Sequence, residues 1–429
     1  MKESRHRKGI SRRGFLGSAL AAGAAFTVVP RHVLGGQGHQ PPSETLTKAV
    51  IGVGGMGQSH VQYPGEKLLA ICDVDEGHLQ STLDKVDDDV KGYHDFRDVI
   101  VRPDIDIVHV VTPPHWHAII SIAAAEAGKD VWSEKPMSHT VGEGQKVQEA
   151  VQKNACIFRL NTWFRFRSTF YGFGTPVKPI KKLADSGLLG WPLKITINES
   201  TGFSWKLTTD RHQGRINVPP EPVPDELDYD FWLGPAPYKP YFRHRTHRSF
   251  RGYWDYEGGG LGDMGQHYLD PSQYILGKDH TSPVEIEADT RFQHPDAAKP
   301  WRRVRMKYAD GCEIICDGEN KLTDAPFMEG PKGKLYPGFK SDILNLREKL
   351  AQFPDPEPQV TDFHEAVRNR EKFALNEMNG HRSCTLVNIA KIAVRLGRKL
   401  RFDPERQEFI GDPEANRLIH PPMRAPWHV

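Results

Sequence analysis

The sequence predicts an α/β fold that begins with a doubly wound parallel sheet. Short runs rich in β-branched residues alternate with apolar helical stretches between residues 47 and 160. Such alternation is typical of a parallel sheet covered by helices on both faces. A G-x-G-x-x-G match, Gly52-Val53-Gly54-Gly55-Met56-Gly57, directly follows the first of these runs. The length of 429 residues leaves room for a second domain with its own core.

The expected elements of the first sheet follow one another closely. A helix between the first two strands must be short, because only ten residues separate Gly57 from Leu68 and Pro64-Gly65 lies among them. In chain order we expect strands over 47–53 and 67–73, a strand over 106–112, a helix over 117–127, a strand over 130–133, a helix over 141–153 and a strand over 155–160.

The glycine motif and the strand ends predict a dinucleotide site. Glycines let a tight turn bring backbone N–H groups against a pyrophosphate at a helix N-terminus. Asp73 ends the second strand, 21 residues after Gly52, where an acid accepts hydrogen bonds from both ribose hydroxyls and repels a 2′-phosphate. We therefore expect NAD rather than NADP. The expected cofactor-binding residues are Gly52, Gly54, Gly55, Met56, Gly57, Asp73, Thr112, Pro113, His115, His117, Glu134 and Lys135.

The sequence gives little support for a metal site. His115 and His117 stand two residues apart, but no further ligand spacing accompanies them, so a capping or substrate-facing role is favoured. Cys312 and Cys316 lie in a run that alternates like a strand, which favours buried small side chains over a metal pair. The five cysteines are odd in number and irregularly spaced, so no disulfide framework is expected.

Several longer segments resemble the Gfo/Idh/MocA oxidoreductase family, and the similarity covers nearly everything after residue 46. The matching segments are the glycine motif, CDVD at 72–75, TPPHWHA at 112–118, AAAEAGKDVWSEKP at 123–136, LDYDFWLGPAP at 227–237, GGGLGDMGQHYLD at 258–270 and DFHEAVRNR at 362–370. The resemblance implies a C-terminal α/β domain with a large, open, mostly antiparallel sheet, which often forms oligomer contacts. It also places Lys135, Asp263 and His267 on the family's catalytic positions.

Those three residue types suit hydride transfer from a secondary alcohol. His267 is the expected base, since imidazole titrates near neutral pH, and Lys135 can stabilise the developing oxyanion. Asp263 precedes His267 by four residues, so a helix over 261–276 would put both on one face, where Asp263 could orient the imidazole or bind a sugar hydroxyl. Structural roles remain open for all three residues. His267 could be a helical histidine packed in the core, Asp263 an acid that complements the helix dipole, and Lys135 a solvated lysine.

The N-terminus predicts an export signal. Ser11-Arg12-Arg13-Gly14-Phe15-Leu16-Gly17 follows basic residues and precedes a weakly apolar, uncharged stretch that ends at Pro30, which resembles a twin-arginine signal. We expect export to the periplasm or beyond, and no membrane association afterwards. The expected divisions are a signal over 1–35, a linker over 36–46, a Rossmann domain over 47–165, a substrate domain over 166–405 and a tail over 406–429.

Charge and aromatic content bear on the ligand. The net charge of +2 comes from the first 35 residues, which hold seven basic side chains and one acid, so the remainder carries −4 and gives no reason to expect nucleic acid. Aromatics mix with polar residues in 161–167, 203–205, 229–232 and 241–254, as in sugar sites, although a core or an oligomer interface would also use them. The proline-rich segment 202–224 is expected to form a long loop over the cleft.

These observations predict an exported NAD-dependent oxidoreductase that acts on a hydroxyl of a sugar, polyol or glycoside and assembles as a homo-oligomer through its C-terminal sheet. One alternative is a glycosidase that uses NAD transiently, oxidising the sugar, eliminating the aglycone, adding water and returning the hydride. A second alternative is a non-catalytic sugar-binding protein on the same fold.

Overall fold

The computed structural model describes residues 45–162, 164–166 and 173–429. The predicted signal over 1–35 lies outside the described residues, as does all of the linker before residue 45. Residues Leu46–Val429 form one compact unit, and everything below concerns that unit.

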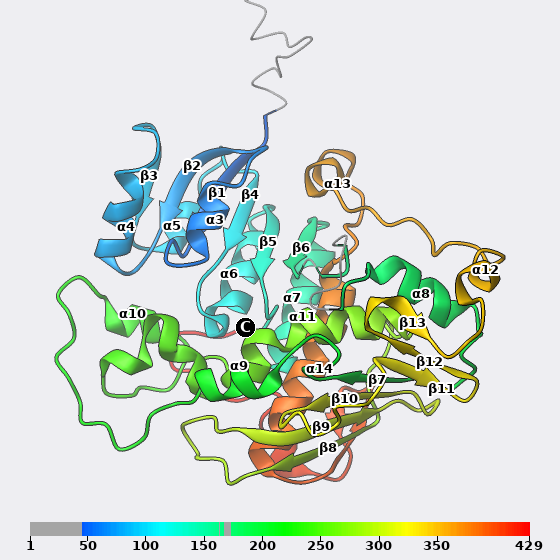
Figure 1. Cartoon of the computed structure of the whole chain (residues 1–429). Helices are drawn as coiled ribbons and strands as arrows, with labels where there is room; N and C mark the ends of the chain where they lie inside the picture. Colours follow the sequence, from blue (N-terminus) through cyan, green and yellow to red (C-terminus); the bar gives the residue numbers. More distant parts are fainter. Residues whose placement is uncertain (1–44, 163, 167–172) are drawn as a thin grey trace, which may run out of the picture. The chain divides into compact units, whose positions relative to one another are not determined.

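The first half of this unit contains a six-stranded sheet in the order β3-β2-β1-β4-β5-β6 (Figure 1). Its strands are β1 Thr47–Ile51, β2 Lys67–Cys72, β3 Lys91–Tyr93, β4 Ile107–Val110, β5 Asp130–Glu134 and β6 Phe158–Asn161. Every pairing is parallel, and β1 lies between β2 and β4. The predicted doubly wound parallel sheet is confirmed.

Five helices connect these strands: α3 Gly57–Val61, α4 Glu76–Leu83, α5 Phe96–Ile100, α6 Pro114–Glu126 and α7 Val141–Lys153. Helix α3 has five residues, as the short interval before the second strand predicts. Helix α7 has the predicted bounds because Thr140 and Glu143 form a capping box that fixes its start.

The second half contains a nine-stranded sheet in the order β13-β12-β11-β7-β10-β9-β8-β14-β15. Its strands are β7 Lys194–Ile197, β8 Glu285–Thr290, β9 Trp301–Lys307, β10 Glu313–Asp317, β11 Met328–Gly330, β12 Gly333–Tyr336, β13 Lys340–Ser341, β14 Leu400–Asp403 and β15 Glu408–Phe409. Only the β7–β10 pairing within this sheet is parallel. The expected large, mostly antiparallel sheet is confirmed.

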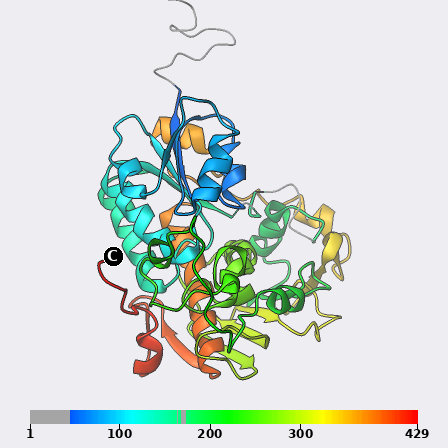
Figure 2. The same cartoon turned by 90° about the vertical axis from the view of Figure 1, so that its left-hand side faces the viewer.

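The long helices α11 and α14 pack on one face of this sheet (Figures 1 and 2), and the second half contains further helices and turns. The helices of this half are α8 Val177–Asp185, α9 Trp205–Arg211, α10 Tyr229–Leu233, α11 Gly259–Ile275, α12 Leu346–Leu350, α13 Phe363–Asn369, α14 Glu377–Leu396 and α15 Pro413–Asn416, with 3-10 turns η2 Arg243–Arg245, η3 His247–Gly252 and η4 Pro337–Phe339. Apolar residues of α8, α11 and α14 share one core with the sheet. In β8 the buried residues alternate with exposed Glu287, so the other face of the strand is open.

Two late segments pack differently from what the predicted domain divisions suggest. Phe363 and Phe373 pack in the core of the parallel sheet, although they fall within the predicted substrate domain. The predicted tail over 406–429 begins with a strand, since β15 pairs with β14, and Trp427 then packs edge-on against Trp116 at 4.7 Å. Apolar side chains late in the chain thus complete the cores of both halves.

The segment 202–224 is also more ordered than predicted, because α9 occupies its first third before an irregular stretch begins. Ser204 caps this helix by accepting a hydrogen bond from the backbone N–H of Leu207. Among the described residues, no helix is long and apolar enough to cross a membrane. All five cysteines are buried and unpaired.

Candidate functional site

A cavity of about 620 Å³ opens at the carboxyl ends of β1, β2, β4 and β5. This is the edge at which doubly wound sheets bind ligands. Both halves of the chain line it. The second half contributes the polar residues Arg211, His212, His247, Arg248, Arg251, Glu257 and Asp263, together with Phe231, Trp232 and Phe250 from the aromatic segments.

The glycine turn forms one wall and leaves no room for larger residues at two positions. Gly52 has φ +88°, and a Cβ atom there would lie 2.8 Å from the backbone nitrogen of Thr112. A Cβ at Gly57 would lie 2.1 Å from the carbonyl oxygen of Gly52. The turn is therefore as tight as the motif predicts, and Gly54, Gly55 and Met56 line the cavity beside it.

Asp73 lies on the cavity wall, as predicted, and its carboxylate also fixes the surrounding loops. Its Oδ2 accepts a hydrogen bond from the backbone N–H of Val53 at 2.9 Å. Its Oδ1 accepts one from the backbone N–H of Asp75 at 3.0 Å. The acid therefore joins the glycine turn to the end of β2.

Most of the predicted strand-end residues line the cavity. Thr112, Pro113, His117, Glu134 and Lys135 line the cavity. The ring nitrogens of His117 lie 2.7 Å from the carbonyl oxygens of Thr112 and Pro136, so this imidazole holds the two strand-end loops together.

His115 is not among the cavity-lining residues, so its predicted contact with the cofactor stays a prediction without support from this geometry. Its ring is buried against the second half of the chain, with Nε2 3.1 Å from the carbonyl oxygen of Trp232. Helix α6 starts at Pro114, three residues before the predicted start at residue 117, so His115 lies in its first turn.

Lys135 and Asp263 form a buried ion pair in the cavity. The ammonium of Lys135 donates to the carboxylate Oδ1 of Asp263 at 2.8 Å and to its backbone oxygen at 2.6 Å. Burial alone would lower the pKa of Lys135, but the carboxylates of Asp263 and Glu257 outweigh it and raise that pKa. Burial likewise opposes ionisation of Asp263, but Lys135, His212 and Arg251 hold its pKa well below the usual value. Both groups are therefore charged at neutral pH.

Asp263 and His267 contact different groups, so an orienting role of Asp263 toward His267 stays a prediction. The two residues share helix α11, as predicted, but the carboxylate is held by Lys135, His212 and Arg251. His267 directs Nδ1 to the hydroxyl of Thr162 at 3.0 Å, and its ring stacks on Phe164 with 4.6 Å between centroids. It is not among the cavity-lining residues. Its catalytic role therefore stays a prediction without support from this geometry.

Sequence reasoning missed three residues beside the ion pair. His212 Nε2 lies 3.1 Å from Asp263 Oδ2, and Arg251 Nε lies 3.1 Å from Asp263 Oδ1. Glu257 is 1% exposed, and burial first, then the charge of Asp263, raises its pKa to about 7 against the effect of Arg251 and Lys135. The sequence pointed only to the segments that contain His212 and Arg251, which were expected to cover the cleft and to bind sugars, and not to the individual residues.

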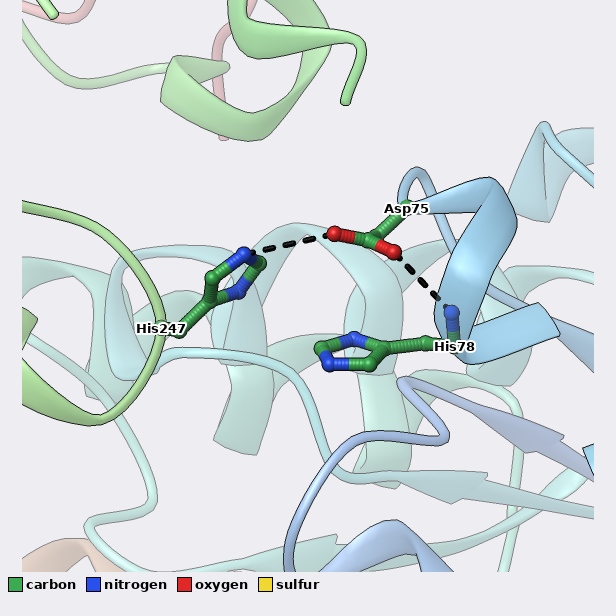
Figure 3. A group of neighbouring side chains, drawn as sticks. All are labelled: Asp75, His78 and His247. Carbon is green, nitrogen blue, oxygen red and sulfur yellow. Dashed lines mark hydrogen bonds and ion pairs between the residues drawn. The ribbon is translucent and has the colours of Figure 1, made fainter. Parts of the chain in front are cut away.

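Asp75, His78 and His247 gather at the cavity rim (Figure 3), with ligand atoms within 4.8 Å of one another. That spacing could hold a metal ion, but both oxygens of Asp75 have partners. Oδ1 accepts from the backbone N–H of His78 at 2.9 Å, and Oδ2 lies 3.3 Å from His247 Nε2. The trio thus joins the start of α4 to the start of η3.

Two family models together match almost the whole described unit. Residues 46–162 match "Oxidoreductase family, NAD-binding Rossmann fold", and residues 173–429 match "Oxidoreductase family, C-terminal alpha/beta domain". Among curated relatives, inositol 2-dehydrogenase of Salmonella typhimurium is 29% identical over 204 residues, or 46% of this chain and 56% of that protein. A glycosyl hydrolase family 109 protein of Shewanella baltica is 36% identical over 132 residues, or 27% of this chain and 28% of that protein.

The chain thus spans only about half the length of the first of these relatives. Among solved structures, the WlbA dehydrogenase from Bordetella pertussis, determined in complex with NADH and UDP-GlcNAcA, superposes with a TM-score of 0.56 at 16% identity. The superposition covers 84% of this chain and 99% of that one, and it shows that the two share a fold.

The position of Asp73 predicts the choice of dinucleotide. The wild-type protein should bind NAD at least tenfold more tightly than NADP, because the carboxylate would repel a 2′-phosphate. Asp73→Asn keeps the shape and one of the two backbone hydrogen bonds but removes the charge. It should therefore narrow the preference for NAD by about 1.4 kcal/mol or more, a tenfold change in the ratio of dissociation constants. Calorimetric titration with both dinucleotides measures this ratio. Equal affinities in the wild type would contradict the prediction.

Proposed function

The chain belongs to the Gfo/Idh/MocA oxidoreductase family, and from this premise we propose that it transfers a hydride between NAD and a secondary hydroxyl of a sugar, polyol or glycoside. The observation that carries the proposal is the buried Lys135–Asp263–His212 group, which shares one cavity with the glycine turn. A bound nicotinamide would supply the hydride acceptor or donor.

The residues present fit a dinucleotide. The close approaches at Gly52 and Gly57 leave backbone rather than side chains on the cavity wall. Asp73 stands where a ribose would need an acceptor, and Met56 is 43% exposed at the mouth of the turn.

We propose distinct roles for the charged residues during oxidation. Lys135, held protonated by Asp263, donates a hydrogen bond to the oxygen that becomes negative as the hydroxyl proton leaves. His212 donates from Nε2 to Asp263, which leaves Nδ1 available to take the proton. Asp263 orients both groups. The base assigned by sequence to His267 is therefore reassigned to His212.

The glycosidase alternative rests on one specific observation, the 36% identity to a glycosyl hydrolase family 109 protein. Its first step would be the same hydride transfer, so the same residues would serve it. Purified protein should release the aglycone of a glycoside without added NAD if this alternative is correct. A strict requirement for added NAD, with a ketone as the product, supports the dehydrogenase.

Two further properties remain proposals. We propose export by the twin-arginine route, supported by the Arg12-Arg13 pair and its neighbours. We also propose that the chain forms a homo-oligomer through the open face of the nine-stranded sheet. That face carries charged residues such as Glu287 and Arg303, and light scattering would measure the oligomer directly.

The assignment of the base predicts different effects for two histidines. His212→Asn should lower kcat by roughly 10²–10⁴-fold, the usual loss for a general acid–base group. NAD affinity should change little, because the glycine turn and Asp73 lie on the first domain. His267→Asn is the matched control and should keep most of the activity. Steady-state rates with a sugar or polyol substrate test this, and the reverse pattern would return the role to His267.

The export proposal predicts the fate of a signal variant. Arg12→Lys combined with Arg13→Lys should keep the protein in the cytosol, because the arginine pair itself is recognised. Fractionation of cells expressing either form measures the distribution. Secretion of the folded double variant at the wild-type level would show that another route is used.

A further inference from the structure

A second, smaller cavity is lined by both halves of the chain. Its volume is about 110 Å³, enough for several water molecules or one small ligand. The first half contributes His115 and His139, and helix α14 of the second half contributes Asn388, Lys391 and Arg395. None of the described residues lines both this cavity and the larger one. A ligand bound here would contact both halves of the chain away from the glycine turn.

The cavity contains a buried lysine that has no acidic partner. Lys391 is 7% exposed, and its ammonium donates to the carbonyl oxygen of His139 at 3.0 Å. Burial lowers the pKa of Lys391 to about 8, although the charges of Glu257 and Glu143 oppose the shift, so the ammonium stays charged at neutral pH. Among the described residues no carboxylate forms an ion pair with it, and a buried charge without a partner destabilises the fold. An anion would supply the missing partner.

Arg395 adds a second cation on the same side of α14. Residues four apart lie on one face of a helix, and like charges at that spacing repel each other. The guanidinium of Arg395 lies 5.7 Å from the ring centroid of Trp254, and it donates to the carbonyl oxygen of Pro295 at 3.4 Å. In the described part of the chain this arginine has no ion-pair partner either. Two such cations in one small cavity indicate an anionic group in the ligand.

The acidic residues of the cavity have other partners. Oε2 of Glu143 accepts hydrogen bonds from the backbone N–H groups of His139 and Thr140, in the cap of α7. Burial raises the pKa of Glu143 to about 7, so this carboxyl carries less than a full charge at neutral pH. Asp255 Oδ2 lies 3.8 Å from the ammonium of Lys239. Neither acid therefore pairs with the cations of α14.

Two neutral imidazoles present acceptors in the same cavity. The Nε2 atoms of His115 and His139 lie 3.1 Å and 2.8 Å from the carbonyl oxygens of Trp232 and Trp254. A carbonyl oxygen only accepts, so each ring carries its proton on Nε2 and leaves Nδ1 as an acceptor. Burial lowers the pKa of both histidines, to about 3 for His115, so neither takes a second proton near neutral pH. None of the described residues donates to either Nδ1 atom, and hydroxyl groups of a ligand would do so.

The remaining wall of the cavity is apolar. It is formed by residues 235–237, which follow α10, and by Leu418 and residues 421–423 near the C-terminus. The backbone N–H of Arg424 donates to the carbonyl oxygen of Pro235 at 2.9 Å, which fixes the C-terminal segment in place. Proline, alanine, leucine and methionine side chains pack against carbon atoms, so this wall suits an organic anion better than a hydrated inorganic one.

We propose that this cavity binds a small hydroxycarboxylate. The carboxylate pairs with Lys391 and Arg395, the hydroxyl groups donate to Nδ1 of His115 and His139, and the carbon atoms lie against the apolar wall. No covalent bond forms or breaks. Since the cavity is separate from the one that contains the glycine turn, this inference does not depend on the proposed hydride transfer.

Calorimetric titration of the full-length protein tests the site with three molecules of the same length. Glycerate carries a carboxylate and two hydroxyl groups, propionate lacks the hydroxyl groups, and glycerol lacks the carboxylate. Glycerate should bind once per chain and about fivefold or more tightly than either of the others, the effect of one net hydrogen bond or more. It should also bind more tightly than inorganic phosphate, because of the apolar wall.

Variants of α14 locate the binding. Lys391→Met keeps the length of the side chain and removes its charge, so it should weaken glycerate binding roughly tenfold or more, the loss expected for a hydrogen bond to a charged group. Arg395→Gln should weaken binding in the same direction, and it tests the site if the Lys391 variant fails to fold. Lys153→Met is the matched control and should bind as the wild type does, since Lys153 is exposed at the end of α7 and lies outside the cavity. Thermal unfolding without ligand shows which variants are folded.

Three results would overturn the inference. One is a wild type that binds glycerate no more tightly than propionate, glycerol or phosphate. Another is unchanged glycerate affinity in the folded α14 variants. The third is loss of binding in Arg251→Gln but not in those variants, which would place the anion in the larger cavity. The titration needs no turnover, so these results leave the hydride transfer open, and a failure to form NADH from any sugar or polyol leaves this site open in turn.

Discussion

The ion pair between Lys135 and Asp263 is the constraint on which the site depends. It joins the end of β5 in the first domain to the first turns of α11 in the second, and both side chains are only 11% exposed. Such a pair is stable only if the remaining donors and acceptors of both side chains form hydrogen bonds, and removing one partner leaves an unpaired buried charge. Here Lys135 also donates to the backbone of Asp263, and Asp263 accepts from His212 and Arg251. These contacts therefore hold the end of β5 against α11 at the cavity.

Glycines at the start of α11 make this arrangement possible. Gly258 and Gly259 have φ of +92° and +80°, and a Cβ at Gly262 would lie 2.2 Å from the carbonyl oxygen of Glu257. The chain can thus turn tightly enough for Glu257 and Asp263 to face the same cavity. One carboxylate is firmly ionised there, while the pKa of the other is about 7. Protonation of Glu257 removes one negative charge from beside Lys135 and Arg251, which favours a developing alkoxide.

Local patterns predicted the first domain well, because its glycine turn, its strand ends and its capping box are set by neighbouring residues. The sequence also predicted that Asp263 and His267 share a helix. Spacing cannot show which side chains lie opposite that helix, however, and three side chains from other segments hold Asp263 instead. His212 follows a short helix in a segment with little periodicity, so nothing local singled it out. His60 and His109 are each a lone histidine in the sequence, 49 residues apart, and only the folded sheet brings them together.

Glu134 and Lys135 are neighbours at the end of β5, but their side chains contact two different groups of polar residues. Successive side chains at a strand end point to opposite sides, so neighbours in sequence face different surroundings. Lys135 reaches across the cavity to α11, while Glu134 turns to His60 on α3 and to the side-chain amide of Asn161 on β6. The ammonium next to Glu134 helps to keep that carboxylate ionised, and the carboxylate in turn helps to keep Lys135 protonated. The two charges are adjacent in the chain, so no motion of the domains can separate them.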